Sequence, residues 1–292
     1  MLSLSYEIDA RTVIGTVQLR VSDLQRSVDF YKEVVGLRVL KRDGECAALG
    51  VPGSEKPLLA LREIAGAVPR PRRSGAGLYH VALLVPDRRS LGLALRNLVA
   101  SGIQVGQSDH LVSEALYISD PDNNGIEIYR DRPREEWQWD GEGHVRMAVD
   151  PIDWDGLLAE AADAPWTGLP AGTTVGHIHL HVTELPTTEH FYVDLLGFNT
   201  VAHMADSAMF ISAGGYHHHI GLNVWAGVGA PLTPDSAPGL DYFEIVLPTE
   251  DEQMTVFGRL QAASVPLRTE RGTIIAHDPS GIQIHIIVRG PA

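Results

Sequence analysis

The sequence predicts an α+β fold made of four βαβββ modules, because two segments of the chain each recur once. Residues 15–37 (GTVQLRVSDLQRSVDFYKEVVGL) and 176–198 (GHIHLHVTELPTTEHFYVDLLGF) share an alternating strand, an acidic residue, a helix that carries Phe-Tyr, and a closing glycine. Residues 77–86 (GLYHVALLVP) and 239–248 (GLDYFEIVLP) form a second pair, and each leads into a helical stretch. The repeats therefore predict the order of strands and helices along most of the chain.

Each copy of the second pair then reaches a strand opened by Asp-Pro, at Asp120-Pro121 and at Asp278-Pro279. Short strands with Gly and Pro turns fill the remainder of each module. The modules cover about 12–64, 76–131, 173–226 and 237–289. We expect a first domain at 12–131 (modules one and two), a connecting segment at 132–172, and a second domain at 173–289 (modules three and four).

The first helix of each 23-residue repeat has recognisable ends. Asp23 and Glu184 lie where a carboxylate favours a helix N-terminus, and Gly36 and Gly197 lie where a helix usually ends. The connecting segment is rich in Trp, Asp, Pro and Gly and is predicted to hold one short helix, 153–162. Connections of this length are usually functional.

The chain has 292 residues, a formal net charge of −14 and 44% hydrophobic residues, as in soluble globular proteins. It has no apolar run long enough for a membrane helix, and Met1 to Arg11 lack a secretory signal pattern. With the single cysteine, Cys46, these features lead us to expect a cytoplasmic protein. The negative charge disfavours nucleic acid and membrane partners. Thirteen histidines are the unusual feature, because histidine is the commonest metal ligand.

The modules resemble the vicinal oxygen chelate superfamily, which includes glyoxalase I, bleomycin-resistance proteins and type I extradiol dioxygenases. Four modules in one chain, with the phrases NGIEIYRDRPREEW and GGYHHHIGLN, look most like the bacterial catechol 2,3-dioxygenase group. The resemblance covers about 12–289. It implies that paired modules form curved mixed sheets around a metal cleft, with ligands from the first and last strands of a module.

Strand alternation separates a core face from a cleft face on these strands. In the first strand of module three, apolar residues alternate with His177, His179 and His181, which are therefore predicted to face the cleft. The same alternation in module two places His80 on the cleft face, at the position equivalent to His177.

The last strand of module two follows Asp-Pro in the phrase DPDNNGIEIY. Ile126 and Ile128 mark its core face, so Glu127 is predicted to point into the cleft. The predicted metal ligands are thus His80, Glu127 and His177. Two imidazoles and one carboxylate suit non-haem Fe(II), accept Mn(II) as well, and leave positions open for substrate and dioxygen.

This ligand set predicts how the modules pair. His80 and Glu127 lie in module two and His177 in module three, so we expect these two modules to pair around the metal. Modules one and four would then form a metal-free half. The alternative is pairing of modules three and four, with a site made of His177, His285 and Glu244.

The resemblance extends to the signature of extradiol enzymes, in which a His is followed by a Tyr, an Asp-Pro turn and a Glu. His110, Tyr117, Asp120-Pro121 and Glu127 fit it, whereas Asn123 stands where Gly or Pro is usual and puts the turn geometry in question. The resemblance implies that His110 and Tyr117 donate hydrogen bonds to the substrate or to oxygen intermediates.

The phrase YHHHIGLN supplies three candidates for the acid–base histidine that the resemblance implies. Counting back from Ile220 and its neighbours favours His218, whereas strand alternation favours His219 or His217. The sequence leaves these alternatives open.

The resemblance implies an oxidoreductase of aromatic catabolism, a type I extradiol dioxygenase that opens a catechol-type ring with O2 at an Fe(II) site. One rival is a glyoxalase-like, metal-dependent isomerase or lyase; its fourth ligand position, near Gly221, offers no carboxylate here. The other rival is a non-catalytic protein that binds an aromatic compound or antibiotic. The ring substituents are not readable from the sequence, and neither is the oligomeric state, although members of this superfamily are often homo-oligomers.

Overall fold

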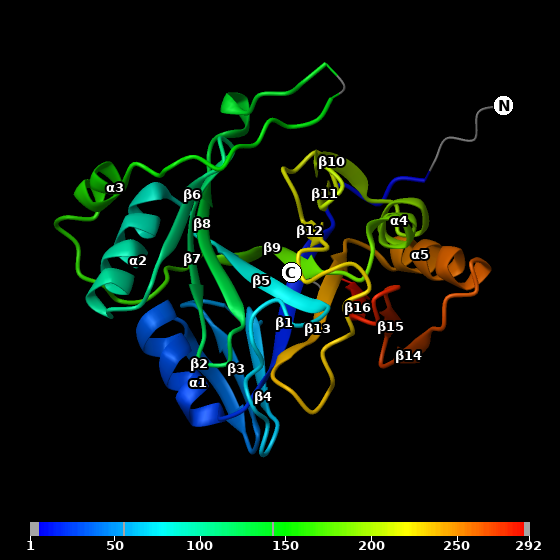
Figure 1. Cartoon of the computed structure of the whole chain (residues 1–292), viewed down its shortest axis with the longest axis horizontal. Helices are drawn as coiled ribbons and strands as arrows, with labels where there is room; N and C mark the ends of the chain where they lie inside the picture. Colours follow the sequence, from blue (N-terminus) through cyan, green and yellow to red (C-terminus); the bar gives the residue numbers. More distant parts are fainter. Residues whose placement is uncertain (1–5, 55, 142, 289–292) are drawn as a thin grey trace.

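The computed structural model describes residues 6–288, apart from positions 55 and 142. Its strands form two eight-stranded mixed sheets, which confirms the predicted α+β class (Figure 1). Residues 1–5, which belong to the segment considered for a secretory signal, lie outside the described part. So does residue 289, the last residue of module four. Within that part, no helix combines the length and the apolarity needed to cross a bilayer.

One sheet combines modules one and four, in the strand order β14-β15-β16-β13-β1-β4-β3-β2. Module one supplies β1 (Val13–Val21), α1 (Leu24–Phe30), η1 (Tyr31–Val35), β2 (Arg38–Asp43), β3 (Cys46–Gly50) and β4 (Leu59–Glu63). Module four supplies β13 (Gly239–Leu247), α5 (Glu250–Ala262), β14 (Arg268–Glu270), β15 (Thr273–His277) and β16 (Gln283–Val288).

The other sheet combines modules two and three, in the order β10-β11-β12-β9-β5-β8-β7-β6. Module two supplies β5 (Gly77–Leu84), α2 (Arg88–Ala100), β6 (Gly106–Asp109), β7 (Ser113–Ser119) and β8 (Gly125–Asp131). Module three supplies β9 (Thr174–His181), α4 (Leu185–Glu189), η3 (His190–Leu195), β10 (Asn199–Met204), β11 (Ala208–Ser212) and β12 (Ile220–Asn223).

In each sheet the first strands of the two modules pair antiparallel at the centre, as β1 with β13 and β5 with β9. The pairing of module two with module three, predicted from its histidines and Glu127, is the pairing that the sheets have. The ranges 12–131 and 173–289 each contribute strands to both sheets.

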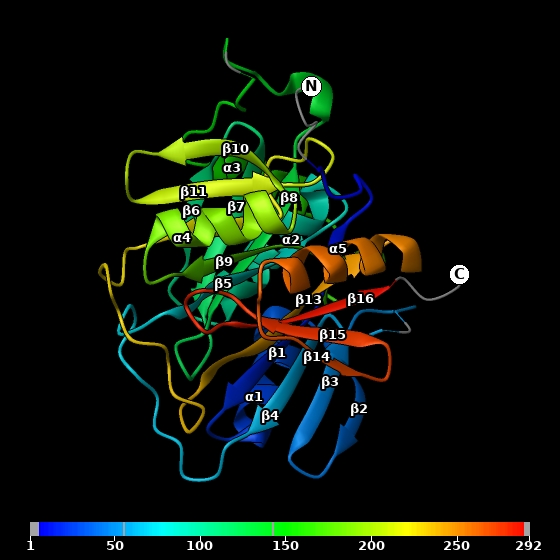
Figure 2. The same ribbon diagram turned by 90° about the vertical axis from the view of Figure 1, so that its right-hand side faces the viewer.

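The helices connect the modules in chain order. Tyr31 donates a hydrogen bond to the Asp120 carboxylate (3.0 Å), and Tyr192 donates one to Asp278 (3.2 Å), so each Phe-Tyr motif reaches the Asp-Pro turn of the next module. Figure 2 shows α4 and α5 side by side on the outer face of the molecule, and Arg259 of α5 donates to the Leu195 carbonyl (3.0 Å). A single buried apolar cluster extends through all four modules.

The helix ends agree with the local sequence. Asp23 accepts a hydrogen bond from the Arg26 amide and caps α1, and Gly36 takes the left-handed φ of 91° that follows η1. Glu184 precedes α4 but makes no capping bond to the backbone. Both helices finish in a π-helical turn, η1 and η3, which the sequence pattern did not indicate.

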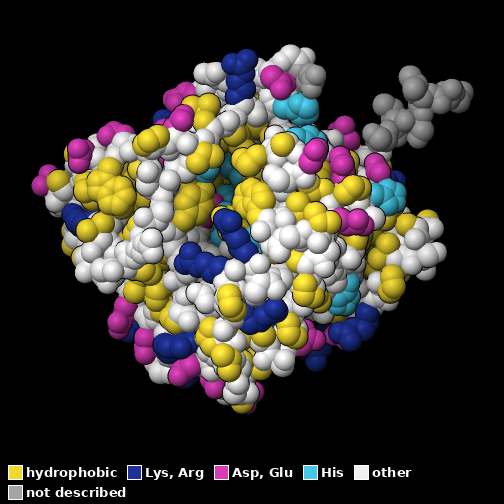
Figure 3. All heavy atoms as spheres, viewed as in Figure 1, with side chains coloured by type: hydrophobic (Ala, Val, Ile, Leu, Met, Phe, Trp, Pro, Cys, Tyr) yellow, Lys and Arg dark blue, Asp and Glu magenta, His cyan; other side chains and the backbone are white. Residues whose placement is uncertain are grey.

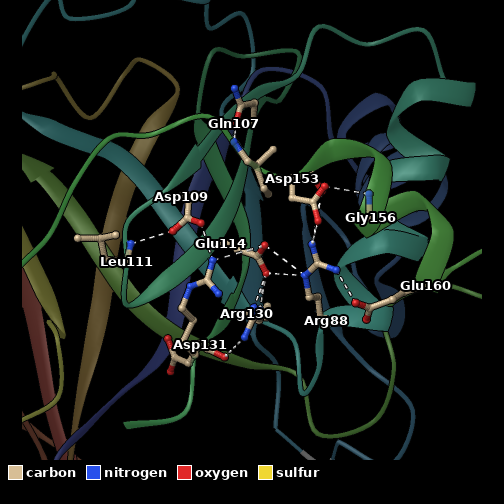
Figure 4. Close-up of polar contacts among 12 residues, drawn as sticks. Arg88, Gln107, Asp109, Leu111, Glu114, Arg130, Asp131, Asp153, Gly156 and Glu160 are labelled. Carbon is tan, nitrogen blue, oxygen red and sulfur yellow. Dashed lines mark hydrogen bonds and ion pairs between the residues drawn. The ribbon is translucent and has the colours of Figure 1, made fainter. Parts of the chain in front are cut away.

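The connecting segment packs against module two. It holds η2 (Arg134–Glu136) and α3 (Trp154–Glu160), the latter close to the predicted 153–162. Arg88 of α2 donates hydrogen bonds to Asp153 (3.1 Å) and to the buried Glu114 (2.9 Å). It also forms an ion pair with Glu160 (Figure 4). Glu114 is also paired with Arg130, so several arginine contacts compensate its burial.

Candidate metal centre

The three predicted ligands come from adjacent strands of one sheet. His80 lies on β5, Glu127 on β8 and His177 on β9, with β5 between the other two. A β-bulge between Leu78 and His80 leaves Tyr79 unpaired and brings its ring to 4.9 Å from the His80 ring. Tyr79 and His80 therefore both line the cleft, which strict alternation did not predict.

The side chains of His80, Glu127 and His177 converge on one point. Glu127 Oε2 lies 2.9 Å from His80 Nε2 and 3.1 Å from His177 Nε2. One potential ligand atom from each residue lies within 4.8 Å of the other two. All three residues are buried.

Electrostatics keeps this cluster in the protonation state that suits a cation. Burial would raise the pKa of Glu127, but the charge of His177, its hydrogen bond to Glu127 and the nearby His80 outweigh burial and hold that pKa well below its usual range. Burial lowers the pKa of His177 to about 4, although Glu127 acts in the opposite direction. Near neutral pH the cluster is thus an ionised carboxylate with an unprotonated His177.

Unsatisfied nitrogens indicate that the protein alone does not complete this cluster. His80 Nε2 lies 2.9 Å from Glu127 Oε2 but makes no hydrogen bond of good geometry, and the buried His177 Nδ1 has no partner in the described part of the chain. Such atoms cost stability unless something binds them. Two imidazoles and a carboxylate with spare lone pairs fit a divalent transition-metal ion.

The other histidines of β9 share the cleft face as predicted. His179 lines the same cavity as His177, whereas His181 lines a neighbouring pocket. The alternative ligand set is not formed, because His285 and Glu244 lie in the other sheet, where His285 stacks on Tyr242 with ring centroids 3.7 Å apart.

The histidines of the YHHH phrase have different surroundings. His217 Nε2 lies 2.8 Å from the Asp131 carboxylate, and His217 Nδ1 lies 2.8 Å from His218 Nδ1. A carboxylate only accepts, so His217 carries its proton on Nε2, and its Nδ1 accepts from His218 Nδ1–H when both rings are neutral. That leaves His218 Nε2 unprotonated in a residue that lines the cavity. His219 instead accepts a hydrogen bond from the Ala213 amide (3.1 Å).

His110 and Tyr117 form a hydrogen-bonded pair on the opposite wall. His110 Nδ1 lies 2.6 Å from the Ala148 carbonyl oxygen, an acceptor, so Nδ1 carries the proton. With His110 neutral, its Nε2 accepts from the Tyr117 hydroxyl at 2.7 Å. Burial, and then the charge of Glu127, raises the pKa of Tyr117 well above its usual value, which keeps the hydroxyl protonated.

These residues surround a cavity of about 670 Å³ whose lining is mostly apolar. Figure 3 shows a hollow near the middle of this face, with histidine side chains inside it. Phe210 and Trp225 come from module three, whereas Met147, Ala148 and Val149 come from the connecting segment. The sequence did not assign these residues to the site, although the length of the connecting segment suggested a functional role.

Two backbone features shape the site. Asn123, in question as a departure from the signature, adopts a left-handed φ of 68°, which asparagine tolerates better than most residues. Asp120 holds the turn by accepting from the Asn124 amide (2.8 Å). At Gly221 a Cβ would lie 2.8 Å from the His179 ring, so this position excludes any side chain as a further ligand while His179 stays in place.

Comparisons with known proteins agree with this architecture. The family model described as Glyoxalase/Bleomycin resistance protein/Dioxygenase superfamily matches residues 13–128. Together with the relative described next, this match shows that the chain belongs to that superfamily, as the sequence predicted.

A catechol-2,3-dioxygenase of Bacillus subtilis (strain 168) is 48% identical over 279 residues, covering 95% of this chain and 98% of that protein. Two solved structures share the fold at low identity. A Bacillus subtilis subsp. subtilis str. 168 protein gives a TM-score of 0.64 at 17% identity, covering 98% of this chain and 87% of the other. Glyoxalase I from Zea mays gives 0.55 at 16% identity, covering 95% and 92%.

Proposed function

We propose that this chain is a type I extradiol dioxygenase, which opens a catechol-type ring next to its two hydroxyl groups. The observation that carries the proposal is the convergence of His80, Glu127 and His177 beside a mostly apolar cavity that also holds His218 and Tyr117. Its similarity to a catechol-2,3-dioxygenase supports the same reaction.

His80, Glu127 and His177 would hold Fe(II), or Mn(II), which accepts the same ligands. When bound, the metal supplies Lewis acidity to the diol oxygens and a binding position for O2. In the balanced reaction, one ring C–C bond breaks and both atoms of O2 enter the product. One of the two carbons becomes a carboxylate and the other an aldehyde.

His218 is the acid–base residue in this proposal. Its ring centroid lies 4.0 Å from that of His177, so it stands beside the place where the diol would bind. Asp131 and His217 fix its tautomer and leave Nε2 able to accept a diol proton and return it later. We therefore assign no catalytic role to His219, whose Nδ1 is engaged by the Ala213 backbone.

Tyr117 and His110 provide polar contacts on the other side of the cavity. While His110 is neutral, the Tyr117 hydroxyl donates to it and can accept a hydrogen bond from the substrate. If His110 gains a proton, its Nε2 donates to Tyr117, which then donates into the cavity. The pair can thus stabilise negative charge that develops during ring opening.

The rival isomerase reaction is less consistent with the site. Four-ligand sites of the glyoxalase kind use a second carboxylate, and the position considered for it is Gly221, where the His179 ring leaves no room for a side chain.

The proposal is tested by purifying the protein without oxygen, measuring Fe and Mn, and following O2 consumption with catechol. We expect about one metal ion per chain and one O2 consumed per catechol, with a yellow ring-opened product. Turnover that continues without O2 would identify the isomerase instead. A metal-free protein that binds catechol but consumes no O2 after iron is added would identify a binding protein.

A further inference from the structure

A second, smaller pocket adjoins the catalytic cavity. It has a volume of about 150 Å³ and shares Tyr79, His80 and Tyr117 with the main cavity. Because His80 is a proposed metal ligand, the small pocket begins at the edge of the metal centre. Its remaining lining includes the guanidinium-bearing residues Arg72 and Arg73.

The charge of this pocket is opposite to that of the whole protein. The chain carries −14, yet the lining of the small pocket contains two arginines and no carboxylate. In the described part of the chain the buried Asp122 carboxylate pairs with Arg26, whereas neither Arg72 nor Arg73 has a carboxylate oxygen within 4.0 Å. Both side chains are exposed, and Figure 3 shows Lys and Arg side chains beside the central hollow.

Both arginines are held in place without being neutralised. Arg72 donates a hydrogen bond to the Ser119 hydroxyl, and the Arg73 guanidinium lies 5.9 Å from the centre of the Tyr79 ring. Neutral anchors of this kind orient a guanidinium and preserve its positive charge. A planar guanidinium matches a carboxylate, to which it can donate two parallel hydrogen bonds.

We propose that Arg72 and Arg73 form a subsite for an anionic substituent on the substrate, so that the preferred substrates are catechols that carry a carboxylate-bearing side chain. The pocket volume of about 150 Å³ is enough for such a group. This inference rests on the proposed ring-cleaving function for the identity of the ring, but not for the binding of the anion.

The first test uses pairs of substrates that differ only in charge. Oxygen uptake is measured with 3,4-dihydroxybenzoate, 3,4-dihydroxyphenylacetate, 3-(3,4-dihydroxyphenyl)propanoate and the methyl ester of each. We expect one or more of the acids to be used better than its ester. In the double variant Arg72→Gln/Arg73→Gln, kcat/KM for that acid should fall about tenfold, because partly exposed ion pairs are modest, and the ester should change less than about twofold.

A matched control is Arg89→Gln/Arg271→Gln, which also removes two positive charges, but from exposed positions outside the pocket lining. It should leave the ratio of acid to ester unchanged. Raising the ionic strength should weaken the preference of the wild type for the acid and have little effect on the Arg72→Gln/Arg73→Gln variant.

The second test does not need catalysis. Calorimetry with 3-phenylpropanoate, which has no diol, is run on metal-free wild type and both double variants, with 3-phenylpropanol as the uncharged control. Binding of the acid that is lost only in Arg72→Gln/Arg73→Gln supports the subsite even if no ring is cleaved. The inference is overturned if acids and esters respond equally to the substitutions and the metal-free protein does not distinguish 3-phenylpropanoate from 3-phenylpropanol.

Discussion

The two sheets have the same module arrangement but very different cleft faces. The repeats and the strand register align His80 with Tyr242, His177 with Thr16, and Glu127 with His285. In the sheet of modules two and three, the three side chains meet at one point and leave buried nitrogens without partners.

In the sheet of modules one and four, polar groups of the equivalent face bond to neighbours within the protein. Asp241, aligned with Tyr79, accepts from Gln18 (2.6 Å) and from Arg62 (2.9 Å). His285 accepts from the Gln283 amide at 2.9 Å, and Thr16 donates from its hydroxyl to a backbone carbonyl. The fold thus supplies two such strand faces, and incomplete hydrogen bonding distinguishes the face suited to a metal from the structural one.

The largest expected effect separates the two faces directly. Glu127→Ala should lower metal content to below about a tenth of the wild-type value and turnover by at least about a thousandfold, since even residues outside the ligand set alter metal sites ten- to a hundredfold. His285→Ala, at the equivalent position, should leave both within about twofold. Metal analysis and O2 uptake measure the difference, with circular dichroism as the check on folding. Full activity in Glu127→Ala would defeat the ligand assignment.

The next effect tests the acid–base residue. Ile220 pairs with Ile178 and Leu59 pairs with the equivalent residue Val17, so His218 occupies the position that Pro57 has in module one. The cleft face of modules one and four therefore has no residue that corresponds to His218. His218→Ala should reduce kcat by about a hundred- to ten-thousandfold, the usual range for a general acid–base group.

His219→Ala is the matched control for His218. It should keep kcat within a few-fold and lower the free energy of unfolding by about 1 kcal/mol, because the Ala213 amide loses its acceptor. Steady-state kinetics and urea unfolding report the two quantities. The opposite pattern would move the acid–base role to His219.

A smaller effect is expected at Tyr117, which pairs with Glu127 across β7 and β8. In the other sheet the equivalent position is Ile275, which pairs with His285 and has no hydroxyl group. Tyr117→Phe should lower kcat by about tenfold, because it removes one hydrogen bond of roughly 1–1.5 kcal/mol near developing charge. Tyr242→Phe in the other cleft should not change kcat. Equal rates in the two variants would remove Tyr117 from the mechanism.

A last effect, on stability and not on activity, concerns a feature that the two sheets share. Burial raises the pKa of Asp120 and of Asp278 to about 6, against hydrogen bonds that lower it. Because the folded-state pKa lies above the unfolded value near 3.8, each protonated carboxyl group stabilises the fold below about pH 4. This contribution, about 3 kcal/mol per group, is lost as the pH rises through 6.

Asp120→Asn and Asp278→Asn should each remove this loss between pH 4 and 7, by similar amounts. The measurement is the change in unfolding free energy across that range, not its absolute value, because Asn replaces one acceptor oxygen with a donor. A change in only one variant would show that the two turns differ in protonation despite their matching contacts.

Much of this protein is determined by local sequence. Alternation alone put Val81, Leu83, Ile126 and Ile178 in the core, where all are fully buried, because successive side chains of a strand point to opposite faces. Asp-Pro aligned the last strands, and the position of His177 in module three indicated which modules pair. The resemblance to the superfamily rested on the same repeats.

Only the tertiary structure separated the three adjacent histidines. Alternation favoured His219 or His217, whereas counting back from Ile220 favoured His218. All three residues precede β12, and contacts with Asp131 and Ala213 decide where the rings of His217 and His219 point. The bulge at Tyr79 also depended on the pairing of β5 with β9.

The modules and the core faces of β5, β8 and β9 could be predicted from periodicities read within a few residues, and the family resemblance then indicated the three residues proposed to hold a metal. The tertiary structure decided the rest: the connecting segment as a wall of the cavity, the tautomers of His110 and His218, and the unpaired charges of Arg72 and Arg73. Those properties arise from contacts between segments far apart in the chain, which no local pattern encodes.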